Sequence, residues 1–176
     1  MIMTVEELKQ YIKTNEQDAV LEAKLQALEL LIRKKTNNNF QQRSFRFTCD
    51  VGSLGLMKIS ELFKVGDTVE LSESDYNKGV YTIISIDSEN GCMGLNEALF
   101  PEQNVLVTKV VYPSDVKMGV ANMIDWDLNH RSKIGIQSET ISRHSVTYFN
   151  MDGDNSSIGY PKSLIGFLQP YMKARF

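Results

Sequence analysis

The hydrophobic periodicity of this sequence changes twice along the chain, and this change limits the folds that the chain can adopt. Before residue 40 and again after residue 113, apolar residues recur at the spacing of one helix face. Between these regions lie β-branched segments bounded by Gly, Asp, Asn and Pro, which indicate short strands. The 176 residues, 42% of them hydrophobic, suffice for one domain or for one domain that carries an insertion. The sequence therefore predicts helices on both sides of a β-rich middle.

Two helices are predicted in the first part of the chain. Thr4 and Glu7 have the spacing of a capping box that begins the first helix. Thr14 and Gln17 have the same spacing and are predicted to begin the second. The second helix should end in the run of asparagines before Phe40, because Asn competes for backbone hydrogen bonds and tolerates a left-handed turn. Its predicted buried stripe consists of Leu21, Leu25, Leu28 and Ile32.

The middle of the chain is predicted to form a small antiparallel module. Its strand candidates include GDTVELSES, KGVYTIISID and NVLVTKVVY, and their succession resembles a small barrel of the SH3-like type. Between Asp50 and Glu102 there are ten acidic and three basic residues, a net charge of −7, whereas the rest of the chain carries +4. This asymmetry indicates either a solvated barrel surface or a face turned toward passing DNA or a basic partner.

A third helix is predicted after Pro113 and Ser114, which are typical start signals. Its apolar stripe consists of Val116, Val120, Met123, Ile124 and Leu128. Two such stripes are most simply buried against each other. We therefore predict an α+β fold, a small helical bundle of about three main helices plus a short C-terminal helix, with an inserted antiparallel β-module. The bundle would comprise residues 1–44 and 112–176, and the insert residues 45–111.

We predict no catalytic, metal or cofactor site, and we do not expect the chain to be an enzyme. His130 and His144 are the only histidines, and no motif brings two ligands to one helix face. Nucleophile-elbow, P-loop and dinucleotide-binding patterns are all absent from the sequence. Cys49 and Cys92 form no CxxC pair, so we expect both to be small buried apolar residues.

One loop has part of the spacing of a calcium site. Asp152, Asp154 and Ser156 stand at the first, third and fifth positions of an EF-hand loop. Ser157 and Ser163 stand where that loop needs Gly and Glu. The pattern therefore favours a solvent-facing loop without calcium.

Neither nucleic-acid binding nor membrane insertion has strong support in the sequence. Basic residues with interleaved aromatics suit single-strand binding, but a helix end followed by a half-buried strand gives the same pattern. The residues in question are Arg33, Lys34, Lys35, Phe40, Arg43, Phe45, Arg46 and Phe47. A net charge of −3 does not favour DNA. No apolar run approaches the roughly 20 residues that a membrane helix needs.

The order of the helical segments carries a family resemblance. AVLEAKLQALELLIRKKTNNNF is followed, after the third helix, by GIQSETISRHSVTYF and then by YPKSLIGFLQPY. These segments, in this order, resemble the head–tail connector (adaptor) proteins of tailed bacteriophages. The resemblance covers about residues 1–45 and 112–176, and it does not include the β-rich middle.

The resemblance implies a structural virion protein that forms a ring, most simply a dodecamer, beneath the portal. Such a ring joins the DNA-filled head to the tail and extends the DNA channel, through which double-stranded DNA passes without sequence-specific binding. Its partners would be further copies of itself, the portal protein and a downstream neck or tail-completion protein, without a membrane or a cofactor. It would reside at the head–tail interface or neck of the virion, after assembly in the cytoplasm of the bacterial host.

The alternative function is a small β-barrel adaptor or nucleic-acid-binding module on a helical scaffold, and an unrecognised hydrolase is a third. Under the connector hypothesis the C-terminal region supplies the contacts with neighbouring subunits or with the portal. The candidate interface residues are Val146, Tyr148, Phe149, Tyr160, Leu164, Phe167, Leu168, Tyr171, Arg175 and Phe176. Pro161 suits the first turn of the predicted C-terminal helix. The competing interpretation is that this short helix packs on its own chain. The acidic middle is expected on the outside of the ring.

Overall fold

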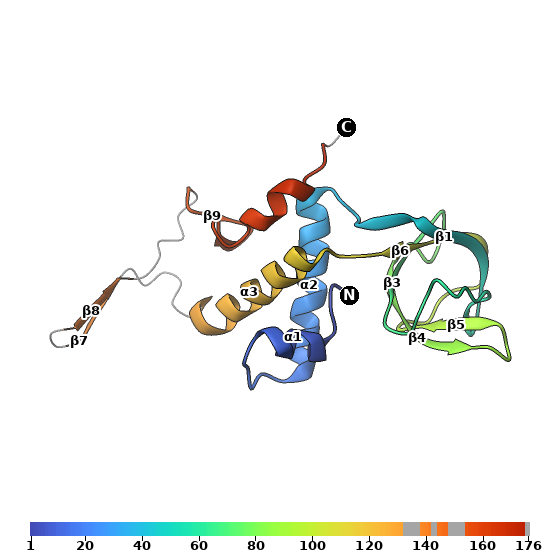
Figure 1. Ribbon diagram of the computed structural model, residues 1–176, viewed down its shortest axis with the longest axis horizontal. Coiled ribbons are helices and arrows are strands. Elements are labelled where there is room, and N and C mark those ends of the chain that lie inside the picture. The colour runs from blue at the N-terminus through green and yellow to red at the C-terminus, as the bar shows by residue number, and fades with distance from the viewer. Residues whose placement is uncertain (132–137, 142–143, 148–153, 175–176) are drawn as a thin grey trace.

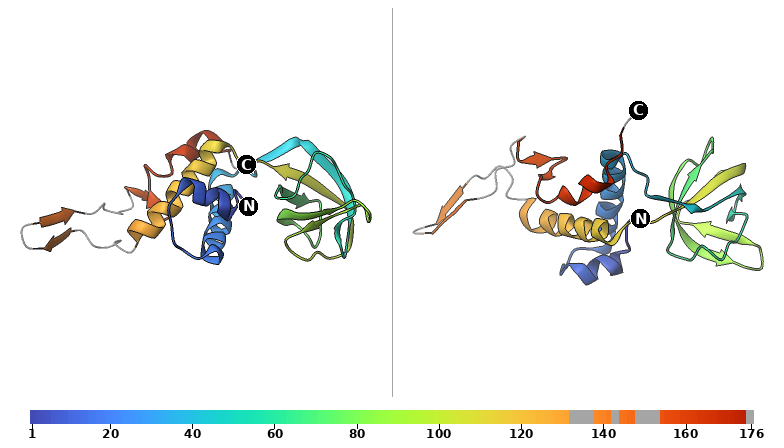
Figure 2. Two further views of the ribbon diagram at one scale, coloured as in Figure 1. Left: turned by 60° about the horizontal axis from the view of Figure 1, so that its bottom comes forward. Right: turned by 45° about the horizontal axis from the view of Figure 1, so that its top comes forward.

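A computed structural model of the chain describes residues 1–131, 138–141, 144–147 and 154–174. A closed β-barrel lies at one end of the molecule, the helices lie in the middle, and a small β-hairpin projects from the other end (Figure 1). Both views in Figure 2 have the same arrangement, so the separation of barrel and hairpin does not depend on the viewing direction.

The helices follow the predicted periodicity. They are α1 (Val5–Tyr11), α2 (Asp18–Thr36), α3 (Ser114–His130) and the short 3-10 helix η2 (Gly166–Tyr171). The predicted Thr4 cap is confirmed, because its hydroxyl accepts a hydrogen bond of 3.1 Å from the Glu7 amide. The second capping box is wrong, because α2 begins after Gln17 without a side-chain cap and Thr14 instead accepts from the Glu16 amide.

Six antiparallel strands form the barrel, in the order β1-β2-β5-β4-β3-β6. They are β1 (Gln41–Gly52), β2 (Gly55–Leu56), β3 (Thr68–Ser72), β4 (Gly79–Asp87), β5 (Cys92–Leu95) and β6 (Glu102–Val110). The first and last strands close the barrel by pairing along their length, from Gln41 opposite Val110 to Val51 opposite Glu102. A closed barrel has no free edge that would pair with other chains.

Two separate hydrophobic cores hold the molecule together. The barrel core is made of residues from its own strands and of Phe63. The helical core contains the predicted stripes of α2 and α3, in which Leu28 is the most exposed buried member and Leu128 is only partly buried. The helical core also contains Phe40, just before β1, Val110 at the end of β6 and Tyr112, just after β6. The stripes therefore pack on each other as predicted.

The predicted fold class is wrong. The chain is a closed six-stranded antiparallel barrel with about four helices, 30% strand and 33% helix, and it is not a helical bundle with an inserted module. The barrel has a core of its own, and Val110 at the end of β6 belongs to the helical core. Sequence periodicity indicates strands but not which strands pair. It therefore could not predict the pairing of β1 with β6, which closes the barrel.

The C-terminal region differs from its prediction as well. Pro161 lies in a short hairpin of β9 (Ser156–Ser157) and β10 (Tyr160–Pro161), so it does not begin a helix. The helical turn η2 follows later and contains Pro170. The projecting hairpin consists of β7 (Ser138–Ile141) and β8 (His144–Thr147).

Candidate assembly surfaces

An ion pair fixes the barrel against the helices. Arg33 Nη2 on α2 lies 2.8 Å from Glu70 Oε2 on β3, and the two side chains are 9% and 12% exposed. The Glu70 carboxylate also accepts hydrogen bonds from the side-chain amides of Asn39 and Gln41, over 2.9 and 3.1 Å. A buried ion pair holds its geometry when further hydrogen bonds satisfy both groups, as they do here.

A second polar cluster lies beside this pair. Tyr112 donates a hydrogen bond of 2.7 Å to the buried carboxylate of Glu29. The amino group of Met1 lies 3.3 Å from the other oxygen of Glu29 and donates to Thr68 on β3 over 2.9 Å. Burial, reinforced by the charge of Glu29, raises the pKa of the Tyr112 hydroxyl above its ordinary value. The hydroxyl therefore stays a donor, and α2 is joined to the barrel a second time.

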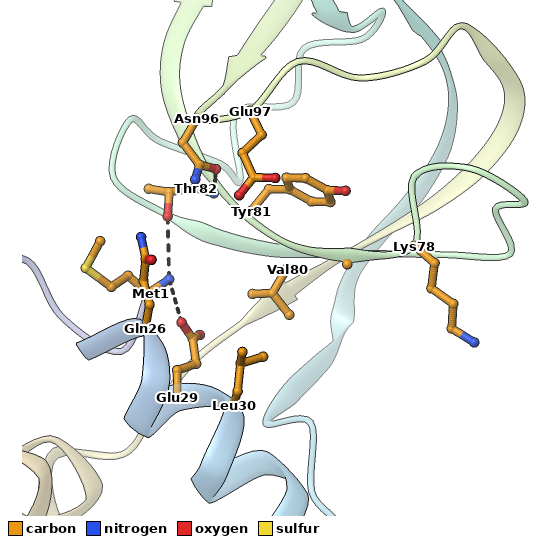
Figure 3. A pocket seen from close by; sticks show the side chains of 11 residues that line it. Met1, Gln26, Glu29, Leu30, Lys78, Val80, Tyr81, Thr82, Asn96 and Glu97 are labelled. Carbon is orange, nitrogen blue, oxygen red and sulfur yellow. Dashed lines mark hydrogen bonds and ion pairs between the residues drawn. The ribbon is translucent and has the colours of Figure 1, made fainter. Parts of the chain in front are cut away.

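A pocket of about 310 Å³ opens at this junction (Figure 3). Its walls come from α2, from β4 and from the loop after β5, and Glu29 and Thr82 approach Met1 from opposite sides. The lining mixes charges of both signs with apolar side chains, of which Leu30 is 65% exposed. The described residues of this pocket include no pair of catalytic groups in hydrogen-bond contact, so we assign it no chemistry.

Arg131 ties the C-terminal region to α3. Its guanidinium donates to Asp127 and lies over the rings of Trp126 and Tyr160, at 5.6 and 5.0 Å from their centres. Lys24 on α2 approaches the second oxygen of Asp127 at 3.0 Å. Burial, with the charge of Asp127, raises the pKa of Tyr160 to about 12. The cluster holds β10 against the end of α3.

The 3-10 helix η2 rests on a glycine of α3. Gly119 is buried, and a Cβ atom at this position would overlap the ring of Phe167. We expect Gly119→Ala to lower the free energy of unfolding by about 1 kcal/mol, because overpacking costs about 1–3 kcal/mol and the gain in helix propensity returns about 1 kcal/mol. Chemical denaturation measures the difference, and Gly166→Ala, at an open position of η2, is the control. Equal stability of Gly119→Ala and wild type would contradict this packing.

The predicted interface residues fall into four groups. Tyr160 and Leu168 are buried in the chain's own helical core. Leu164, Phe167 and Tyr171 are half-buried and pack against that core, as the competing interpretation of a helix folded on its own chain requires. Val146 lies in β8, opposite Glu139 of β7. The others lie outside the described residues, and these are Tyr148, Phe149, Arg175 and Phe176.

The hairpin of β7 and β8 is a two-stranded sheet in the described part of the chain. Four residue pairs join its strands, from Ser138 opposite Thr147 to Ile141 opposite His144. Among the described strands none pairs with the outer edge of either one. The hairpin also lies away from the barrel and the helices in every view (Figures 1 and 2). Within the described residues its backbone edges are unpaired, and an unpaired strand edge can pair with another chain.

The basic and aromatic run from Arg33 to Phe47 is divided by the fold. Arg33 forms the buried ion pair with Glu70, and Phe40 is buried in the helical core. Arg43 and Arg46 are exposed on β1, whereas Phe45 and Phe47 of the same strand are half-buried. The pattern is therefore that of a helix end followed by a half-buried strand, which was the second interpretation of this segment.

The two cysteines and the potential metal ligands are characterised by their burial and their neighbours. Cys49 and Cys92 are buried and unpaired, as predicted, and burial raises the pKa of Cys49 to about 11. Within the part of the chain that the structure describes, no three His, Cys, Asp or Glu side chains gather as metal ligands. No helix among the described residues is long and apolar enough to cross a membrane.

Sequence reasoning missed the residues that join the helices to the barrel. A signal for them exists, because Glu29 and Arg33 continue the apolar stripe of α2 at helical spacing from Leu25. Charged residues on a core-facing stripe indicate a buried ion pair or a polar junction. Glu70 had no comparable signal, because its partners come from a distant segment of the chain.

No known protein family matches this chain, and no curated protein matches it.

Proposed function

We propose that this chain is a structural subunit of the ring beneath the portal of a tailed bacteriophage. The ring joins the DNA-filled head to the tail and extends the DNA channel. The proposal starts from the resemblance of three segments in and around the helical region to head–tail connector proteins, described above. It requires no catalytic residue and no cofactor.

The observation that carries the proposal is the projecting hairpin of β7 and β8. An isolated two-stranded hairpin is marginally stable in water, and strands usually gain their stability from a third strand or a packed face. Among the described strands none pairs with the hairpin as a third strand. A neighbouring copy that pairs with its edge supplies one, by β-strand addition. Repeated head-to-tail contacts of this kind form a ring when the rotation between neighbouring copies closes.

The rigid junction between helices and barrel supports the same proposal. A closed ring requires every subunit to have the same shape, because each interface repeats the same rotation. The pair of Arg33 and Glu70 and the hydrogen bond of Tyr112 to Glu29 hold the barrel in one orientation. A barrel held in this way contributes a fixed surface to each subunit.

The mass of the purified chain, alone and mixed with the portal protein of the same virion, tests the proposal. Mass photometry should detect a portal-bound ring of several copies that follows the symmetry of the portal. We expect Val146→Lys to abolish or strongly reduce the ring, because a lysine on an edge strand opposes strand addition. Gln10→Lys adds the same charge at an exposed position of α1 and should leave the ring intact.

The outcomes separate the function from the mode of contact. A chain that stays monomeric in the presence of the portal would contradict the ring function. A ring that forms equally well with Val146→Lys would preserve the ring function and remove the hairpin from its interface. Circular dichroism of both variants establishes that the chains are folded.

A further inference from the structure

Two aromatic side chains stand exposed side by side on the barrel. Tyr76, before β4, is 72% exposed, and Phe100, before β6, is 66% exposed. Their ring centres lie 6.4 Å apart at an interplanar angle of 56°. Single exposed apolar residues are common, but a contacting pair from two different loops forms a continuous apolar surface.

Asn77 joins the two loops that carry this pair. Its side chain is almost completely buried, with 2% of the residue exposed. The amide nitrogen donates to the Phe100 carbonyl and the amide oxygen accepts from the Phe100 N–H, both over 2.8 Å. Asn77 follows Tyr76 directly in the chain and makes two hydrogen bonds to the backbone of Phe100. These bonds fix the position of the two aromatic residues relative to each other.

Glu102 completes the support beneath the aromatic pair. Its carboxylate accepts hydrogen bonds from the Ser74 hydroxyl and the Asp75 N–H over 2.6 Å and from the Asn77 amide over 2.8 Å. The hydrogen bond from Ser74, together with the others, lowers the pKa of Glu102, so the carboxylate remains an acceptor. Because the loops are already ordered, a ligand that binds there loses little affinity to loop ordering.

The two loops that carry the aromatic pair are acidic in sequence. Residues 72–78 and 96–102 carry four acidic side chains and a single basic one, Lys78. Among the acids, Glu73 and Asp75 are exposed in the loop of Tyr76, whereas Glu97 lines the pocket beside α2 and Glu102 is used within the loop. Aromatic faces and carboxylates together suit a guanidinium, which stacks on rings and pairs with carboxylates. The same charges oppose the phosphates of a nucleic acid, although exposed aromatic rings alone would suit one.

We propose that the face formed by Tyr76 and Phe100, with the exposed acids Glu73 and Asp75 of the loop that carries Tyr76, is a docking surface for an arginine-containing basic segment of another protein. The guanidinium groups would stack on the two rings and pair with the acidic side chains. The surface lies on the barrel, at the opposite end of the molecule from the hairpin, and does not depend on the ring function (Figure 1). One chain therefore offers two separate interaction surfaces.

Binding of a fluorescein-labelled arginine–glycine repeat peptide to the full chain, followed by fluorescence anisotropy, tests this proposal. We expect Tyr76→Ala and Phe100→Ala each to weaken binding at least about tenfold, as truncation of an aromatic anchor does. Tyr76→Phe keeps the ring and should bind like wild type. Ile84→Ala removes another exposed apolar side chain of the barrel, 58% exposed, and should also bind like wild type.

A second variant tests the support of the pair. Asn77→Ala leaves both rings in the chain and should weaken peptide binding, while circular dichroism reports whether the barrel remains folded. Absence of peptide binding, or equal binding by wild type and Tyr76→Ala, would overturn the proposal. Preferential binding of a labelled oligothymidine that is lost in Tyr76→Ala would also overturn it, in favour of a nucleic-acid surface.

Discussion

Glu70→Ala should lower the free energy of unfolding by about 3 kcal/mol, the low end of the range for removal of one partner of a buried ion pair. The substitution leaves the Arg33 guanidinium without its carboxylate at a position where its side chain is only 9% exposed. It also leaves the Asn39 and Gln41 amides without their acceptor. Urea denaturation followed by circular dichroism and by fluorescence of Trp126, the only tryptophan, measures the loss.

Two further variants make the Glu70 experiment specific. Arg43→Ala removes an exposed arginine of β1 and should change stability by no more than about 0.5 kcal/mol. The double variant Arg33→Met with Glu70→Leu should be more stable than Glu70→Ala alone, because no buried charge is left unpaired. A loss in Glu70→Ala as small as that in Arg43→Ala would refute the assignment of this pair as the main tie between helices and barrel.

Gly55→Ala should destabilise the barrel by about 3 kcal/mol, through backbone strain of about 1–3 kcal/mol and overpacking of similar size. Gly55 has φ +114°, and a Cβ atom there would overlap the carbonyl oxygen of Met93 on β5. The backbone of β2 would have to move away from β5, its neighbour in the closed barrel. Thermal or chemical denaturation of the variant measures the effect.

Gly66 provides the matched control for this substitution. It has φ +91°, but no atom lies within 4 Å of the Cβ position that an alanine would create. Gly66→Ala therefore carries backbone strain without the collision and should cost about 1 kcal/mol. If both variants lose the same stability, the close approach of β2 and β5 contributes nothing, and our account of Gly55 is wrong.

The local features of the fold were predictable from the sequence. The apolar stripes of α2 and α3 were identified because helical periodicity depends only on residues three or four positions apart. The Thr4 cap was identified because its partner, Glu7, lies three residues away. The barrel was underestimated because its closure depends on Gln41 meeting Val110, which no local pattern encodes. Pro161 misled the C-terminal prediction, because proline suits both the first turn of a helix and a short strand.

The candidate surfaces were less accessible to sequence reasoning than the fold. The pairing of β7 with β8 was not predicted, and of the hairpin residues only Val146 was anticipated as an interface candidate. The support of Tyr76 and Phe100 was not anticipated, because Asn77 and Glu102 belong to loops that meet only in the folded barrel. An asparagine in a polar loop looks like an ordinary turn residue until its buried position is known.

The paired residues Gln41 and Val110 have a mechanical consequence. The chain enters and leaves the barrel at this pair, so a force that pulls the barrel away from the helices acts on neighbouring ends of β1 and β6. Such a load opens the two strands from one end, one residue pair after another, instead of shearing all their hydrogen bonds at once. The force that the barrel withstands in this direction is therefore set by the Arg33–Glu70 ion pair and the amide hydrogen bonds to Glu70. The pairing of β1 with β6 carries no load as long as these interactions remain intact.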